Sequence, residues 1–506
     1  MSRSVQKAAV LVGCAGYLVV FGWSINSLTY DEWGVLVVTP PIVLLVVVML
    51  RSMFTGDLAP IAKIMYAGIA AKLLGAALRY WVGFEAYQGG IDAQRYHNYA
   101  VTASRDIWDG ASSITTIFRG GTGTPIMEGA TNLVYLITGT SKMAGFVTFA
   151  MLGFVGTAFF VKAACIAIPG LAARRYAVLC IVVPSLVYWP SSIGKDAVML
   201  FTLGVATYGI ARLVSTTAIL IPLAITTAGL IGAGYIRPHL VGLWLAGAFP
   251  ALLVSLIRGR DLTGSTRRGI ERALLLPILV VATIGLLLVS LATVRYLNPK
   301  SDDALTEATI TNILDETKRR TEQANSSFQP PSISNPVMWP YASVRTITRP
   351  LLFEARGSAQ LFTALELTAF LAILASSYRR LLHLPKLLVT NAYVAFAMTT
   401  LFLSGLAFTS FANLGILARQ RSIVFPFMLL VLCLPALSRR TAHDPEGAVE
   451  VDAALARLQT SSQKSSISPR VSAQLASGGS PALFTARHVS TGPPPGNGTN
   501  DDDIWA

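Results

Sequence analysis

Long apolar runs recur along most of this 506-residue chain, and they limit the folds that are open to it. The runs are about 17–22 residues long, which is the length an α-helix needs to cross the hydrocarbon core of a bilayer. Hydrophobic residues make up 53% of the sequence and charged residues only 13%. Core helices of a soluble protein would be shorter and would carry a polar stripe. The sequence therefore predicts an all-α, polytopic membrane helix bundle.

We expect about twelve transmembrane helices within a domain that covers residues 1–440. The first run lacks a convincing small-residue cleavage site, so it is predicted to be a retained anchor. Residues 441–506 are rich in Ser, Pro and Gly, and we predict a disordered cytoplasmic tail there. The predicted spans are 8–25, 34–50, 64–82, 143–162, 176–190, 197–213, 217–235, 240–257, 273–294, 359–377, 388–407 and 422–437.

Basic residues alternate between loops in a way that predicts the orientation, because cytoplasmic loops carry the excess of Lys and Arg. Both termini are thereby predicted to be cytoplasmic in a multi-pass protein of the cell membrane, with two large outer loops at 84–142 and 295–358. The net charge of +14 is then explained by topology and anionic lipids rather than by nucleic acid. The basic residues assigned to the inner side are Arg3, Lys7, Arg51, Lys63, Arg174, Arg175, Arg258, Arg260, Arg267, Arg268, Arg272, Arg379, Arg380, Lys386, Arg439 and Arg440.

Five short polar motifs fall on the outer side once the spans are threaded in this way. Loops placed at random would scatter such motifs over both faces, so their convergence predicts a site at the outer surface. The motifs cover residues 91–97, 192–196, 236–239, 349–354 and 419–421.

The first motif places Asp92, Arg95, Tyr96 and Tyr99 on one face if residues 91–99 are helical. Asp92 is a candidate general base for a sugar hydroxyl or a ligand for a divalent ion. Arg95 and His97 are candidates for contact with an anionic leaving group. The alternative is an interfacial helix with a local Asp–Arg pair and a tyrosine belt.

The tight connection before the span at 197–213 contains Lys195 and Asp196. The lysine is suited to phosphate, and backbone amides around Gly194 would assist it. Asp196 is a further candidate acid. In the alternative interpretation Asp196 caps the following helix and Lys195 extends toward the interface.

Arginines recur at the predicted outer ends of later spans. Arg237 and His239 flank a proline at the start of a span, where a helix N-terminus favours an anion. Arg419 and Arg421 are expected at the outer mouth of the span at 422–437. Arginine forms bidentate contacts with phosphate, so Arg237, Arg419 and Arg421 are predicted to bind substrate, and His239 is predicted to do so beside Arg237. Interfacial anchoring is the alternative.

The motif at 349–354 adds Arg349, a further candidate phosphate ligand, and Glu354, a further candidate acid. Glu366 lies deeper, within the apolar run at 359–377, and Lys72 in the span at 64–82 is its obvious candidate partner. Ionisable side chains at such depth are usually paired and face the bundle interior. We interpret Lys72 and Glu366 as a buried polar pair.

The predicted site at the outer surface thus contains acidic residues and several cationic ones. These charges suit an anionic amphiphile whose apolar part stays in the bilayer, such as a polyprenyl-phosphate-linked sugar. The motifs GIDAQRYH, WPSSIGKDA, RPH, RPLLFEA and LARQR also resemble those of bacterial polysaccharide-polymerase-type membrane proteins. These are similar to polyprenol-dependent (GT-C-type) glycosyltransferases. The resemblance implies sugar transfer from a polyprenyl-phosphate-linked donor to a glycan acceptor on the extracytoplasmic face, in cell-envelope polysaccharide assembly, with Asp92 as base.

The sequence departs from the family in its acidic residues. No acidic pair stands in the first large outer loop, since Asp31 and Glu32 lie in a much shorter one. No metal site and no cofactor is therefore firmly implied, although a divalent cation remains compatible with the motifs. The alternative function is a transporter or flippase for lipid-linked sugars or anionic solutes. The chain has no visible repeat and no matching pair of broken spans, which are typical of transporters.

Overall fold

The computed structural model describes residues 3–118, 121–216, 218–258, 283–285, 317–319, 321, 328–333, 335–355 and 357–436. The described residues form helices, turns and connecting loops, and they contain no β-strand. The chain divides into two units, Met1–Leu437 and Ser438–Ala506, and every described residue belongs to the first. The predicted tail at 441–506 and about half of the outer loop at 295–358, chiefly residues 295–316, lie outside the described residues. The predicted span at 273–294 also does, except for residues 283–285.

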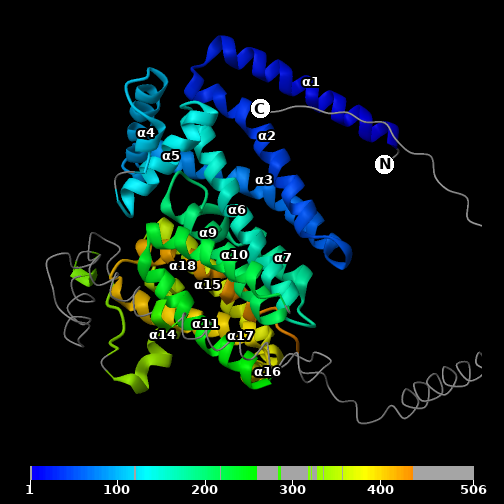
Figure 1. Cartoon of the computed structure of the whole chain (residues 1–506), viewed down its shortest axis with the longest axis vertical. Coiled ribbons are helices and arrows are strands. Elements are labelled where there is room, and N and C mark those ends of the chain that lie inside the picture. Colours follow the sequence, from blue (N-terminus) through cyan, green and yellow to red (C-terminus); the bar gives the residue numbers. More distant parts are fainter. Residues whose placement is uncertain are drawn as a thin grey trace, which may run out of the picture. The chain divides into compact units, whose positions relative to one another are not determined.

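The described part of the chain is built from α-helices (Figure 1). They are α1 (Arg3–Ser27), α2 (Tyr30–Met53), α3 (Ala59–Trp81), α4 (Asp92–Trp108), α5 (Thr124–Thr138), α6 (Lys142–Ala167), α7 (Ala173–Val182), α8 (Pro184–Tyr188), α9 (Lys195–Ser215), α10 (Leu220–Ile236), α11 (Pro238–Arg258), α14 (Trp339–Ile347), α15 (Ser358–Ser376), α16 (Tyr378–Thr390), α17 (Ala392–Ala407) and α18 (Leu414–Val431). The shorter helical turns are η1 (Gly56–Leu58), η2 (Val82–Ala86), η3 (Ile114–Thr116), η5 (Pro336–Met338), η6 (Leu352–Glu354) and η7 (Phe408–Ser410).

Seven helices in the described part of the chain are long and apolar enough to cross a membrane. Helices α15 and α16 form an eighth span if they are counted together, but they meet at a bend of 79°. The all-helical, membrane-embedded class is thus confirmed, whereas the number of twelve spans stays a prediction. The seven helical segments are Tyr30–Met53, Gly56–Ala86, Lys142–Ala167, Lys195–Ser215, Pro238–Ile257, Ala392–Ser410 and Leu414–Val431.

Several predicted spans differ from the helices that form. The apolar part of α1 and helix α10 are shorter, at Leu11–Ser27 and Leu220–Ile236. The predicted span at 176–190 is divided into α7 and α8 at Pro184, because proline cannot donate the backbone hydrogen bond that would continue the helix. The last span begins at Leu414 rather than at 422, since Asn413 caps α18 by accepting from the amides of Gly415 and Ile416.

Helices α6 and α9 form the most extensive interface and lie at the centre of the core. In Figure 1, α6 passes beside α9, and α4 and α5 lie together near one end of α6. Small residues permit this approach: a Cβ added to Gly156 would lie 2.4 Å from the carbonyl oxygen of Leu200. A Cβ on Gly204 would lie 2.5 Å from the carbonyl oxygen of Gly156. Close backbone approach at small residues is how helices associate in a membrane, where no hydrophobic driving force acts between them.

The predicted Lys72–Glu366 pair is wrong, because each side chain serves one end of the short helix α8. The Lys72 ammonium donates to the carbonyl oxygen of Leu186 at 2.7 Å and to the Ser191 hydroxyl at 3.3 Å. The Glu366 carboxylate accepts from the Ser185 amide at 2.7 Å and from its hydroxyl. A carboxylate at the N-terminal end and an ammonium near the C-terminal end satisfy the backbone groups that the break at Pro184 exposes.

We predict that Gly156→Ala destabilises the fold by about 1–3 kcal/mol, because the new methyl group would overlap the α9 backbone. The melting temperature of the detergent-purified protein measures this change. Gly13→Ala in α1 is the matched control, since a Cβ there meets nothing within 4 Å. Equal melting temperatures for the two variants would show that α6 and α9 do not approach closely at Gly156.

Candidate functional site

A buried carboxylate lies at the centre of the site. Helix α9 begins at Lys195, so Asp196 stands in its first turn, where the helix N-terminus favours negative charge. The Arg419 Nε donates to one carboxylate oxygen of Asp196. The Arg237 Nη2 forms an ion pair with the other oxygen at 3.1 Å. The Asp196 side chain is only 4% exposed, so this carboxylate holds two arginines in place rather than facing solvent.

The second guanidinium comes from the junction between two helices. Arg237 follows α10 directly, and Pro238 begins α11, a position that suits proline because its missing N–H would have no partner there. The Arg237 Nη1 also donates to the Gln420 Oε1 at 3.0 Å. Arg237 thereby joins the α10–α11 junction to both α9 and α18.

Arg419 extends the cluster to the surface. Its Nη1 donates to the Asp92 carboxylate at 3.1 Å, while its Nε holds Asp196. Asp92 is the first residue of α4, and its side chain is 57% exposed. The site thus contains one buried carboxylate, which is structural, and one open carboxylate, which can meet a ligand.

Lys195 stands beside this cluster in a half-buried position. Its Nζ donates to the Thr124 Oγ1 at 3.1 Å. Thr124 begins α5, and the preceding Gly123 is tied to the end of α10 because its amide donates to the carbonyl of Tyr235 at 2.7 Å. An ammonium carries three donors, so Lys195 keeps donor capacity for a further ligand.

The tyrosine of the first motif, Tyr96, lies near the open carboxylate of Asp92. Tyr96 is 2% exposed. Burial, and then the nearby Asp92 carboxylate, raise the pKa of Tyr96 to about 12. Its phenol therefore stays protonated at neutral pH and acts only as a neutral hydrogen-bonding group.

Two neighbours of Asp92 in the sequence point elsewhere. Arg95 pairs with Glu128 of α5 at 3.0 Å. The His97 Nδ1 bonds with the Tyr135 hydroxyl at 2.6 Å. Burial, and then Lys142, lower the pKa of His97 to about 4, so the ring is neutral near pH 7. These contacts dock α4 onto α5, and the contact of His97 with an anionic leaving group stays a prediction.

The two arginines of α18 serve different sites. Because α18 begins at Leu414, both arginines lie within the helix, and residues two apart face different sides. Arg421 is fully buried and donates to the carbonyl oxygens of Ile347 at 3.3 Å and of Arg349 at 2.5 Å. The grouping of Arg421 with Arg237 and Arg419 is therefore wrong.

The predicted acid of the fourth motif is also engaged locally. Glu354 pairs with the Arg349 Nη2 at 2.7 Å, and it accepts from the Leu351 amide at 3.0 Å. These bonds close the turn η6, and neither residue is bonded to the Asp196 cluster in the described structure. His239 lies in the first turn of α11, and its buried Nδ1 has no partner among the described residues.

Charge and spacing in the sequence do not assign a role to three residues at or near the site. Gln420 and Thr124 position charged groups, yet neutral side chains give no signal in a search for charges. Arg79 of α3 donates to the Tyr188 hydroxyl at 2.9 Å, and its guanidinium lies 5.1 Å from the centre of the Trp189 ring. Arg79 stands in the last turn of α3, and an arginine at the end of an apolar run is a signal that the sequence does show.

The charges of this cluster fit an anion better than a cation. Lys195, Arg237 and Arg419 face two carboxylates, those of Asp92 and Asp196, which leaves a net positive charge. Within the described ranges, no three His, Cys, Asp or Glu side chains are grouped so that they could hold a metal ion. No protein-family model, curated protein or solved structure matches this chain.

Asp196→Asn is expected to destabilise the protein by about 3–5 kcal/mol, because it leaves two largely buried guanidinium groups without their counter-charge. Asp92→Asn removes an exposed partner of Arg419 and should cost at most about 1 kcal/mol. Melting temperatures of the two purified variants measure the difference. Equal losses would contradict the assignment of one structural and one open carboxylate.

Proposed function

We propose that this protein transfers or polymerises sugars from a polyprenyl-phosphate-linked donor on the extracytoplasmic face of the cell membrane. The observation that carries the proposal is the contact of the exposed Asp92 carboxylate with Arg419, beside Lys195 and Arg237. Four segments that are distant in sequence supply these side chains. The extracytoplasmic location rests on the alternation of basic loops, as does the cytoplasmic placement of both termini.

Asp92 is the general base in this proposal. A base must reach the proton that it removes, and Asp92 is the open carboxylate of the cluster. It would accept the proton of an acceptor hydroxyl as that oxygen attacks the anomeric carbon of the donor sugar. The bond between the sugar and the polyprenyl phosphate breaks at the same carbon, and the phosphate leaves as an anion. Arg419 orients the base, because one of its nitrogens is held by the buried Asp196.

Lys195 is the best candidate to meet the leaving phosphate. Arg237 and Arg419 are already bonded to carboxylates, whereas Lys195 is bonded to the neutral Thr124 hydroxyl. It is the first residue of α9, and a helix N-terminus favours an anion through its free amides and its dipole. We therefore revise the expected roles: the two arginines shape the positive field, and the lysine makes direct contact.

Asp92→Asn should lower transfer by about 10²–10⁴-fold, the usual contribution of a general base. The assay uses the purified protein in proteoliposomes with radiolabelled polyprenyl-phosphate-linked sugars and a glycan acceptor. Asp109→Asn is the matched control, since Asp109 is an exposed acid at the other end of α4 with no place in the cluster. Wild-type transfer by Asp92→Asn would move the base to another residue.

Lys195→Gln should raise the KM for the donor by about tenfold or more, because a charge-assisted hydrogen bond is lost. Its effect on kcat should be smaller than that of Asp92→Asn. Lys63→Gln, a change at an exposed lysine of α3, controls for loss of positive charge alone. An unchanged donor KM in Lys195→Gln would remove the lysine from the phosphate site.

A transporter or flippase for lipid-linked sugars or anionic solutes is the second candidate, and the broken helices favour it. The α7–α8 and α15–α16 segments are both interrupted, and Glu366 of α15 bonds with Ser185 of α8. Broken helices beside buried charges are typical of transport sites. The same proteoliposomes discriminate: movement of the labelled lipid across the bilayer without a new glycosidic bond would support transport and contradict transfer.

A further inference from the structure

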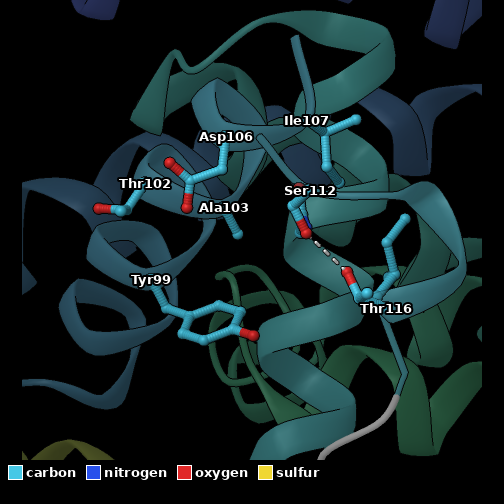
Figure 2. A pocket seen from close by; sticks show the side chains of 9 residues that line it. Tyr99, Thr102, Ala103, Asp106, Ile107, Ser112 and Thr116 are labelled. Carbon is cyan, nitrogen blue, oxygen red and sulfur yellow. Dashed lines mark hydrogen bonds between the residues drawn. The ribbon is translucent and has the colours of Figure 1, made fainter. Parts of the chain in front are cut away.

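A cavity of about 370 Å³ opens beside α4, at the end of the helix away from Asp92. Figure 2 shows Tyr99, Thr102 and Asp106 across this cavity from Ser112 and Thr116. Asn132 of α5 completes the polar lining. The cavity lies in the segment between α3 and α6, and neither the Asp196 cluster nor the α8 region contributes to its lining.

Contacts between α4, η3 and α5 give the cavity its shape. The Ser104 hydroxyl of α4 donates to the Asn132 Oδ1 at 2.8 Å, which leaves the Asn132 amide nitrogen for a ligand. The Ser112 and Thr116 hydroxyls bond with one another at 3.1 Å. Gly129 of α5 permits close packing, since a Cβ there would lie 2.4 Å from the carbonyl oxygen of Ile117. The lining therefore belongs to packed elements.

The chemistry of this lining fits an uncharged polyol. It offers one carboxylate, several hydroxyls, an amide and one partly exposed aromatic ring. Carboxylates and amides hydrogen-bond to hydroxyl groups, and an aromatic face packs against apolar C–H surface. The residues that line the cavity include no lysine or arginine, and Asp106 would repel a phosphate. Asp106 is the sole carboxylate in the lining, too few for a cation site of ordinary ligand count.

We infer that this cavity binds a sugar unit of the glycan acceptor. The helix α4 carries both the open carboxylate of Asp92 and the wall formed by Tyr99 and Asp106, so the two sites are fixed relative to each other. At about 1.5 Å per residue, Tyr99 lies about 10 Å along the helix from Asp92. A short oligosaccharide held in the cavity would direct its terminal hydroxyl toward Asp92. The assignment to the acceptor rests on the proposed function, whereas binding of a saccharide does not.

The direct test is saturation-transfer difference NMR on the full chain in nanodiscs, with free disaccharides of glucose, galactose, mannose and N-acetylglucosamine as probes. We expect millimolar binding of at least one disaccharide. Tyr99→Ala and Asp106→Asn should weaken that binding by about tenfold or more. Asp109→Asn is the matched control, and it should bind as the wild type does, because Asp109 is not part of the lining.

The binding and transfer measurements separate the saccharide site from the proposed reaction. Absence of binding by all four disaccharides, or wild-type binding by both Tyr99→Ala and Asp106→Asn, would overturn the saccharide site. Displacement of the bound disaccharide by inorganic phosphate would also overturn it. If saccharide binds but no transfer is measured, the cavity stands and the proposed reaction falls. In the transfer assay Tyr99→Ala should raise the KM for the acceptor and not for the donor, and the reverse would contradict the acceptor assignment.

Discussion

The candidate site depends on one buried carboxylate that is shared by two guanidinium groups. Removing Asp196 from water is costly, and this cost is offset only if its oxygens are paired well. Arg419 and Arg237 supply that pairing, and the positive end of the α9 dipole favours the charge. Three segments that are far apart in the sequence are thereby fixed at one point. A buried charge cluster of this kind adds little net stability compared with apolar packing, but it specifies position.

The geometry of the open part of the site follows from that cluster. Arg419 has one nitrogen on the buried Asp196 and another on the exposed Asp92, so the buried charge determines where the open carboxylate lies. Gln420 joins Arg237 to the same turn of α18. Lys72 and Glu366 hold the short helix α8 in place. A turn connects α8 to Lys195 at the start of α9. Asp196, Lys72 and Glu366 are thus buried and bonded within the fold, whereas Asp92 is exposed and Lys195 keeps free donor capacity.

The sequence predicts the helical membrane class because an apolar run of sufficient length has few alternatives. It also predicts that the motifs containing Asp92, Asp196, Arg237 and Arg419 meet, since loops on one face of a bundle are neighbours. The sequence does not predict which groups these charged side chains bond with. Lys72 and Glu366 have the charges of a pair, but the break at Pro184 creates free backbone groups that bind them instead. Arg421 has the same chemistry as Arg419, and only the start of α18 at Leu414 separates their faces. The cavity beside α4 is formed by neutral side chains whose convergence no periodicity reveals.

The coupling energy between Asp196 and Arg419 measures whether the buried carboxylate holds the site together. A double-mutant cycle with Asp196→Asn, Arg419→Gln and the double variant can be measured by unfolding of the purified protein. Residues in one ion-pair network show coupling energies of about 0.5–3 kcal/mol, so the double variant should be less destabilised than the sum of the single variants. Additivity within about 0.5 kcal/mol would mean that the two side chains do not interact. The shared carboxylate, and the orientation of Asp92 that depends on it, would then be contradicted.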